Sequence, residues 1–208
     1  MQIQNEYYEE QSIQNKKFQN TIIENCKFTD CNFENCTFES CQIKNSFFVN
    51  CKFQNCSIIS LASKHSEIKN AAFKKCNLIG VHWNELLPTG KYAHCIDCLK
   101  DCYLKYNTFA EMSFIKFDFS TNIIQECMFE ECNLQESSFK DCRLEATEIY
   151  RCDIRKADFR GAMGYVIDIS SNKLKQAKFS FPEVVNLLNT LLSSTLGAPD
   201  LSYIRQIE

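Results

Sequence analysis

The sequence predicts an all-β solenoid built from five-residue units. Within Cys26–Phe53, the first position of each unit is Cys or Ser and the third is Phe or Ile, while the other three positions are almost all polar. A period of five fits neither the 3.6-residue repeat of an amphipathic helix nor the two-residue repeat of a strand. Self-similarity at a fixed period instead indicates a repeat architecture, in which stacked units bury a continuous core.

The pattern covers most of the chain. Units with an apolar third position run through residues 11–85, and Ser63 is the only exception. The register is lost over residues 84–96 and returns shifted by one residue. It then continues through residues 97–181, where Gly164 is the only third position without an apolar side chain.

Phenylalanine is concentrated at the third position, which holds fourteen of the seventeen Phe residues. Stacking the units therefore buries a column of rings. The residues expected to form this structural core are Phe28, Phe33, Phe38, Phe48, Phe53, Phe73, Phe109, Phe114, Phe119, Phe129, Phe139, Phe159 and Phe179.

The cysteine content permits two interpretations, a disulfide scaffold or buried structural thiols. Fourteen Cys in a short secreted chain would indicate a disulfide scaffold. Twelve of them, however, occupy the first position of the unit, where a small apolar side chain is wanted, and free Cys behaves as a small hydrophobe. We therefore expect structural thiols in a reducing compartment.

Units such as CDIRK ADFRG and CNLQE SSFKD resemble the pentapeptide-repeat family, whose consensus is a small residue, a polar one, Leu or Phe, and two polar residues. The resemblance covers about 160 residues. It implies a right-handed quadrilateral β-helix with four units per coil, so that residues twenty apart stack on one face. Eight coils at the ordinary strand spacing would make a rod roughly 38 Å long.

These patterns divide the chain into four parts. We expect a β-helix segment over 1–83, a phase-breaking loop or kink over 84–96, a second β-helix segment over 97–180, and a capping or dimerisation helix with a tail over 181–208. The irregular 84–96 segment is either a bulge or a loop that contacts a partner, because loops on a rigid scaffold often carry binding. The residues that would make such a contact are Asn84, Glu85, Leu86 and Pro88.

A helix is predicted after the last repeat. Ser180 is a suitable N-cap and Pro182 suits a first helical turn, while Gly197 and Pro199 would end the helix. Apolar residues follow at helical spacing and could close the solenoid or seal a two-fold dimer. This expected dimer interface consists of Val184, Leu187, Leu188, Leu191 and Leu192.

No catalytic arrangement is recognisable, so we expect a protein that is not an enzyme and needs no cofactor. The three His residues are scattered and there is no Gly-rich phosphate loop. The segment HCIDCLKDC contains a Cys-x-x-Cys pair, Cys95 and Cys98, that could ligate zinc. Cys102 falls at an inward position and no second Cys-x-x-Cys exists, which favours a loop returning to the solenoid.

Acidic residues are unevenly distributed. The net charge is −3, but residues 121–150 hold seven acids against two basic residues. An acidic rod repels nucleic acid and attracts surfaces built to hold it, although such acids can also serve only to solvate a face. The expected partner contacts are Glu126, Glu130, Glu131, Glu136 and Asp141.

The segment ADFRGAMGYVIDISSNKLKQAKFSFPEVVNLLNTLL is similar to the terminal coil and helix of Qnr-like proteins. The resemblance implies a dimeric, DNA-mimicking rod that binds DNA gyrase and topoisomerase IV and protects them from quinolones, a form of antibiotic resistance. A scaffold for another protein is the alternative. We expect no direct binding of nucleic acid. The polar start and the lack of a long apolar run lead us to expect a cytoplasmic protein without membrane contact.

Overall fold

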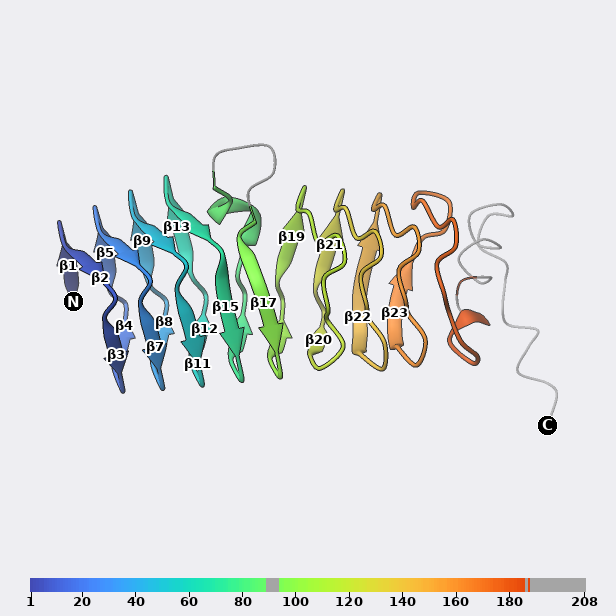
Figure 1. The fold of residues 1–208 in the computed structure, drawn as a ribbon, viewed down its shortest axis with the longest axis horizontal. Helices are drawn as coiled ribbons and strands as arrows, with labels where there is room; N and C mark the ends of the chain where they lie inside the picture. Colours follow the sequence, from blue (N-terminus) through green and yellow to red (C-terminus); the bar gives the residue numbers. More distant parts are fainter. Residues whose placement is uncertain (89–93, 186, 188–208) are drawn as a thin grey trace, which may run out of the picture.

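The structure is a computed structural model and describes residues 1–88, 94–185 and 187. The chain winds into an elongated all-β solenoid of about eight turns (Figure 1). The N-terminus and the last described residues lie at opposite ends of this rod. None of the helices in the described part of the chain is long and apolar enough to cross a membrane.

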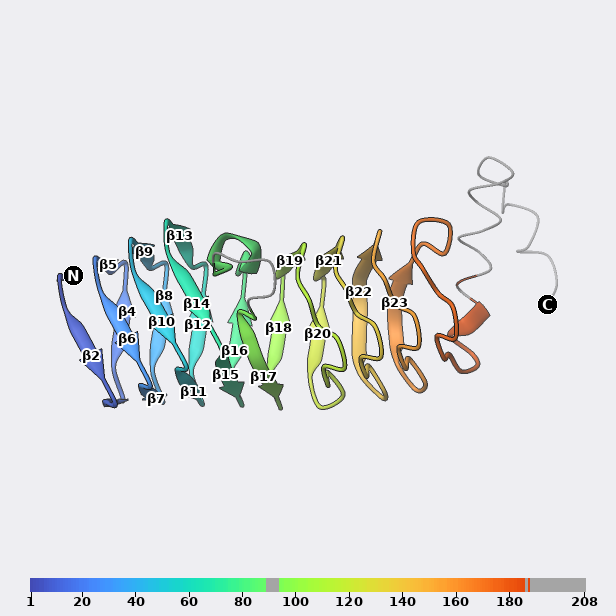
Figure 2. The same ribbon diagram turned by 45° about the horizontal axis from the view of Figure 1, so that its top comes forward.

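Parallel strands form four sides in the N-terminal half, which we name faces A to D (Figure 2). Face A contains β1 (Gln2–Gln4), β5 (Ile22–Glu24), β9 (Gln42–Lys44) and β13 (Ala62–Lys64). Face B contains β2 (Tyr7–Glu9), β6 (Lys27–Thr29), β10 (Phe47–Val49) and β14 (Glu67–Lys69). Face C contains β3 (Ser12–Gln14), β7 (Asn32–Glu34), β11 (Lys52–Gln54), β15 (Ala71–Lys74) and β17 (Ile96–Lys100).

Face D begins with β4 (Lys17–Gln19), β8 (Thr37–Glu39), β12 (Ser57–Ile59) and β16 (Asn77–Ile79), and continues through β18 (Tyr103–Lys105) and β20 (Ile123–Gln125). In the C-terminal half, face A continues in β19 (Thr108–Ala110) and β21 (Met128–Glu130). The long strand β22 (Arg143–Tyr150) turns the corner from face D to face A. Because it pairs with both β20 and β21, it joins the strands of the two faces into one sheet. It also pairs with β23 (Met163–Ile167). Isolated bridges continue faces B and C in this half.

The coils stack with a register of twenty residues, as in the pairing of Phe33 with Phe53 and of Phe53 with Phe73. At most corners, the fifth residue of the unit has a positive φ near +50°. Asn tolerates this left-handed conformation better than most residues, and it fills many corners of the N-terminal half. Side-chain amides at the corners also form hydrogen bonds between coils. The side-chain amide of Asn25 donates to the side-chain carbonyl oxygen of Asn5 at 3.1 Å. The turns therefore need few Gly or Pro residues.

The core is a set of ring columns that follow the rod axis. Twelve of the thirteen Phe residues expected there are buried, and Phe179, in the last coil, is half-buried. Phe139 stacks on Phe119 and Phe159 with ring centroids 4.5 and 4.8 Å away. Phe129 meets Phe139 edge-on at 5.8 Å. Such offset and edge-to-face contacts add to the free energy that burial alone supplies.

The first-position side chains do more than fill space. The Cys31 thiol donates to the carbonyls of Tyr8 and Thr29, at 3.5 and 3.4 Å. Ser46 occupies the equivalent place: its hydroxyl donates to the carbonyl of Lys44 and accepts the backbone N–H of Cys26. Thiols and hydroxyls at this position therefore satisfy backbone groups inside the coil, and all fourteen Cys are free thiols.

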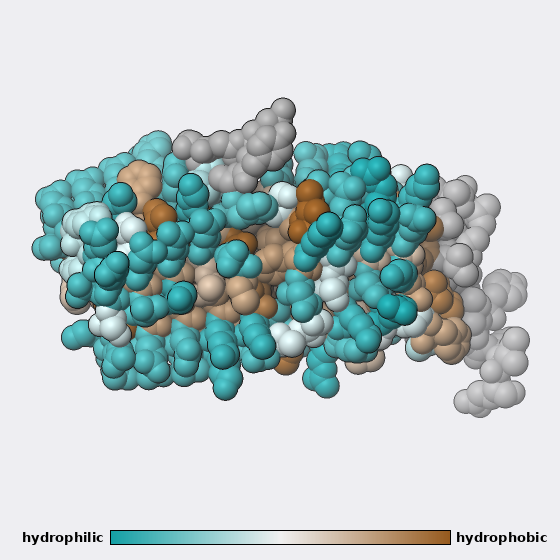
Figure 3. Space-filling model, viewed as in Figure 1, coloured by the Kyte–Doolittle hydropathy of each residue, from teal (hydrophilic) through white to brown (hydrophobic). Residues whose placement is uncertain are grey.

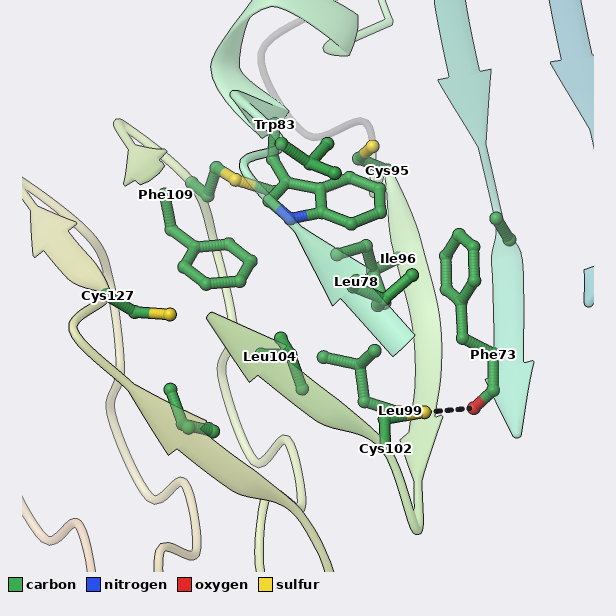
Figure 4. Packing of buried hydrophobic residues seen from close by; sticks show 14 of the residues in the cluster. Phe73, Leu78, Trp83, Cys95, Ile96, Leu99, Cys102, Leu104, Phe109 and Cys127 are labelled. Carbon is green, nitrogen blue, oxygen red and sulfur yellow. Dashed lines mark hydrogen bonds between the residues drawn. The ribbon is translucent and has the colours of Figure 1, made fainter. Parts of the chain in front are cut away.

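The break in the five-residue repeat begins in the coil that follows Ser63. The short 3-10 helix η1 (Trp83–Leu86) buries the Trp83 indole at the next place of the face A column, and the Ser63 hydroxyl donates to the Glu85 carbonyl at 3.0 Å. The indole N–H donates to Asn107, whose amide in turn donates to the Leu78 carbonyl. Figure 4 shows Trp83 among buried side chains that span the interruption. Faces C and D run continuously past it, through the pairing of β15 with β17 and of β16 with β18.

Two expectations for the C-terminal part need correction. Gly164 does not take the third position, because Tyr165 fills the core in its place and packs against Phe159 and Phe179. A Cβ on Gly164 would lie 2.8 Å from the Glu145 Cα, at φ +77°. The expected C-terminal helix is not supported: the described residues form a turn over 181–183, and helical backbone reaches only Val184, Val185 and Leu187. The rest of this segment lies outside the described residues.

Candidate functional site

Five glutamates gather on the C-terminal half of face A and at the two corners that flank it. Glu130 lies in β21 beside Ala110 of β19 and Tyr150 of β22, and Glu148 lies beside Met128. Glu111 and Glu131 follow at the next corner, and Glu126 precedes β21 at the other. We call this group the acidic patch: Glu111, Glu126, Glu130, Glu131 and Glu148.

Only part of the patch is neutralised within the rod. Lys105 pairs with Glu126 at 3.1 Å, and Arg151 pairs with Glu131 at 3.5 Å. Within the described ranges, no ion pair is found for Glu111, Glu130 or Glu148. The patch therefore keeps net negative charge on a flat sheet that a partner can approach.

Exposed apolar side chains lie among these acids. Tyr106 is 51% exposed at the corner, and Met128 and Tyr150 are 38% and 36% exposed on face A. Tyr106, Met128 and Glu148 line a shallow open groove of about 460 Å³ along this edge. The sequence reasoning missed these residues. The signal was an apolar side chain at an outward position of the unit, where the pattern otherwise places polar ones.

The predicted contact residues do not all reach this surface. Asn84 and Glu85 are exposed on η1, which packs against β19 beside the patch. Glu126, Glu130 and Glu131 belong to the patch itself. Glu136 and Asp141 lie at other corners, because each step of five residues advances the chain by one face. Lys116 and Lys156 also flank Glu136, at 3.9 and 3.6 Å.

Two residues expected to contact a partner are buried. Leu86 is 1% exposed and Pro88 is also buried, so neither is available on the surface. The reason is the tight turn of η1, which directs the apolar side chains of this segment into the core while Asn84 and Glu85 face outward.

The expected dimer interface is described only in part. Leu187 is 6% exposed and Val184 packs partly buried against the core. Both side chains thus cover the last coil within the monomer. Leu188, Leu191 and Leu192 lie outside the described residues.

The possible zinc ligands are dispersed. Cys95 and Cys102 are buried, whereas Cys98 is exposed on face C. Cys102 donates instead to the Phe73 carbonyl at 3.5 Å (Figure 4). In the part of the chain that the structure describes, no group of three His, Cys, Asp or Glu residues could hold a metal ion.

The repeat seen in the structure matches a known sequence family. The model for pentapeptide repeats matches eight copies, within residues 17–56 and 125–162. The chain therefore contains pentapeptide repeats in these two segments. The matched residues include both the ring columns of the N-terminal half and the β21–β22 region that carries the acidic patch.

Solved structures similar to this chain include full-length QnrB1, a plasmid-mediated fluoroquinolone resistance protein. It is 15% identical, with 89% of this chain and 99% of that chain covered and a TM-score of 0.37. HetL from the cyanobacterium Nostoc, involved in heterocyst differentiation regulation, is 10% identical, with coverage of 86% and 84% and a TM-score of 0.32. No curated protein matches the chain significantly.

Proposed function

We propose that this protein is a non-enzymatic rod that binds type II topoisomerases, DNA gyrase or topoisomerase IV, and lessens their inhibition by quinolones. The observation that carries the proposal is the acidic patch on a flat, extended side of the rod. A DNA-binding surface is basic, so a rigid acidic face can compete for it through charge complementarity. The proposal agrees with the Qnr-like character of residues 157–192.

The mechanism needs no chemistry on the part of the rod. Glu130 and Glu148 would face cationic side chains of the enzyme, while Tyr106, Met128 and Tyr150 would supply apolar contacts between the charges. Asn84 and Glu85 would extend the contact along face A. Occupation of the DNA-binding surface would then limit formation of the drug-stabilised complex of enzyme and DNA. We also propose a right-handed coil, a cytoplasmic location and a homodimer formed through the segment from Val184 onward.

Reversing the patch charges tests this proposal. We expect Glu130→Lys/Glu148→Lys to bind purified gyrase about tenfold or more weakly than the natural protein at low salt, because rim charges steer and hold such complexes. The matched control is Glu34→Lys/Glu39→Lys, which changes the net charge equally in the N-terminal half. Binding measured by surface plasmon resonance should weaken far less for the control. Equal loss in both variants would contradict the assignment of the patch.

A scaffold for a different protein is the second candidate. Ile123 is exposed on face D beside the half-buried Tyr103, and Met163 is exposed two coils further along. These residues favour a scaffold, because outward apolar side chains on a sheet commonly mark a contact surface. Affinity capture separates the two functions. Recovery of gyrase or topoisomerase IV subunits supports the first, whereas another protein captured in a manner that Ile123→Lys abolishes supports the second.

A further inference from the structure

We propose that the N-terminal end of the rod is a self-complementary surface on which a second copy of this chain stacks, end to end, about a two-fold axis. The inference is independent of topoisomerase binding. It concerns the end of the rod opposite to Val184 and Leu187, so it adds to any contact made there.

The apolar core is open at this end. Ile3, Tyr8 and Ile13 are only partly buried, whereas the corresponding residues one coil further in are buried. Together with Phe18 they line a hollow of about 310 Å³. The Tyr8 ring stacks on Phe28 at 4.9 Å and the Phe18 ring on Phe38 at 4.8 Å, and among the described residues no further ring stacks on the outer side of either.

The first coil also lacks a partner strand at this end, although the carbonyls of Glu9 and Gln19 accept hydrogen bonds from the side chains of Gln11 and Thr21. In the following coils of the N-terminal half, the N–H of each second-position residue donates to the coil before it, as Asn32 does to Gln11. The carbonyl of each fourth-position residue accepts from the same coil, as Glu34 does from Asn15. In the first coil these groups face outward along the axis: Gln2 and Gln4, Tyr7 and Glu9, Ser12 and Gln14, Lys17 and Gln19. They form four strand edges, which are templates for pairing with another chain.

A second copy can satisfy all four edges. If the two-fold axis passes through faces A and C, β1 meets β1 of the other copy and β3 meets its own counterpart. β2 meets β4 of the other copy. All these pairs are antiparallel, and a residue facing the edge can exchange both its hydrogen bonds with the residue opposite. Ile3 then faces Ile3, Ile13 faces Ile13, and Tyr8 faces Phe18, so the ring columns continue across the junction.

Charge selects this axis over the alternative. Glu6, Glu9 and Glu10 lie on or beside face B, whereas Lys16 and Lys17 lie on or beside the opposite face D. Stacking β2 on β4 of the other copy puts Glu9 opposite Lys17, twice in each dimer. An axis through faces B and D would instead place the acidic edge against itself. Like charges placed directly opposite destabilise strand pairing.

A charge exchange at Glu9 and Lys17 tests the proposal. Both side chains are exposed, so the variants are expected to fold. We expect Lys17→Glu to weaken the association of the full chain about tenfold, since two ion pairs become two repulsive pairs. Glu9→Lys/Lys17→Glu should restore it. Lys52→Glu, at the same position of a unit in the middle of face C, is the matched control and should leave it unchanged.

The readout is the weight-average mass from sedimentation equilibrium over a range of protein concentrations, with circular dichroism as the check on folding. A fitted association constant that falls in Lys17→Glu and recovers in the double variant supports the pairing of β2 with β4. Overturning outcomes are a natural protein whose mass does not rise with concentration, and a double variant that associates as weakly as Lys17→Glu.

Discussion

Phe139→Asp is expected to disrupt the C-terminal half of the rod. Phe139 is fully buried and lies between Phe119 and Phe159 in the ring column of face C. Removing a buried Phe side chain costs about 3–5 kcal/mol, and an unpaired buried carboxyl adds a further desolvation penalty of several kcal/mol. Because each coil is stabilised by its two neighbours, the damage spreads along the solenoid.

The measurement is chemical unfolding followed by far-UV circular dichroism, with binding of a hydrophobic dye to report exposed core. Lys140→Asp is the matched control, since Lys140 is the exposed neighbour of Phe139. The control should unfold within about 0.5 kcal/mol of the natural protein. If Phe139→Asp unfolded at the same denaturant concentration as the control, the register of the repeat would be wrong.

The rod is expected to unfold at a lower alkaline pH than a protein without buried thiols. Burial raises the pKa of Cys51 and of Cys142 to about 12, and that of Cys127 to about 11, above the ordinary thiol value of 9.0. These thiols stay protonated in the folded state while they ionise in the unfolded state. Their contribution to stability is therefore complete below pH 9 and is lost as the pH rises toward the folded pKa values.

Each such thiol should cost about 1.4 kcal/mol per pH unit in this window. Denaturant midpoints measured at pH 8, 9, 10 and 11 give the slope. Cys51→Ser/Cys142→Ser is the matched variant, because Ser46 and Ser137 already occupy the same position of the unit elsewhere in the rod. We expect a shallower decline in this variant. Parallel curves for the two proteins would show that the thiols do not set the alkaline limit.

The ring columns could be predicted from sequence because the period of five is tied to burial at the third position. The role of the corners was not predicted. Asn recurs at the fifth position in the N-terminal half, and this signal for a left-handed turn was present in the sequence. The hydrogen bonds of Cys31 and Ser46 could not be read from composition, because burial of a small side chain and satisfaction of the backbone favour the same residues.

Which acidic residues share a face was not predicted from the sequence. Glu130, Glu136 and Asp141 are close in the sequence, yet only Glu130 lies on face A, since five residues carry the chain around one corner. Counting in twenties would have grouped Glu111 with Glu131 and Met128 with Glu148. Leu86 and Pro88 could not be placed in this way, because residues 84–96 lack the repeat that relates sequence to direction.

Restoration of gyrase activity tests the central claim most directly. Purified protein is added to a supercoiling reaction that contains gyrase, relaxed plasmid and an inhibitory amount of ciprofloxacin. We expect supercoiling to return in a concentration-dependent manner with the natural protein, and to a much smaller extent with Glu130→Lys/Glu148→Lys. Failure of the folded natural protein to restore supercoiling at any concentration would contradict the proposed function.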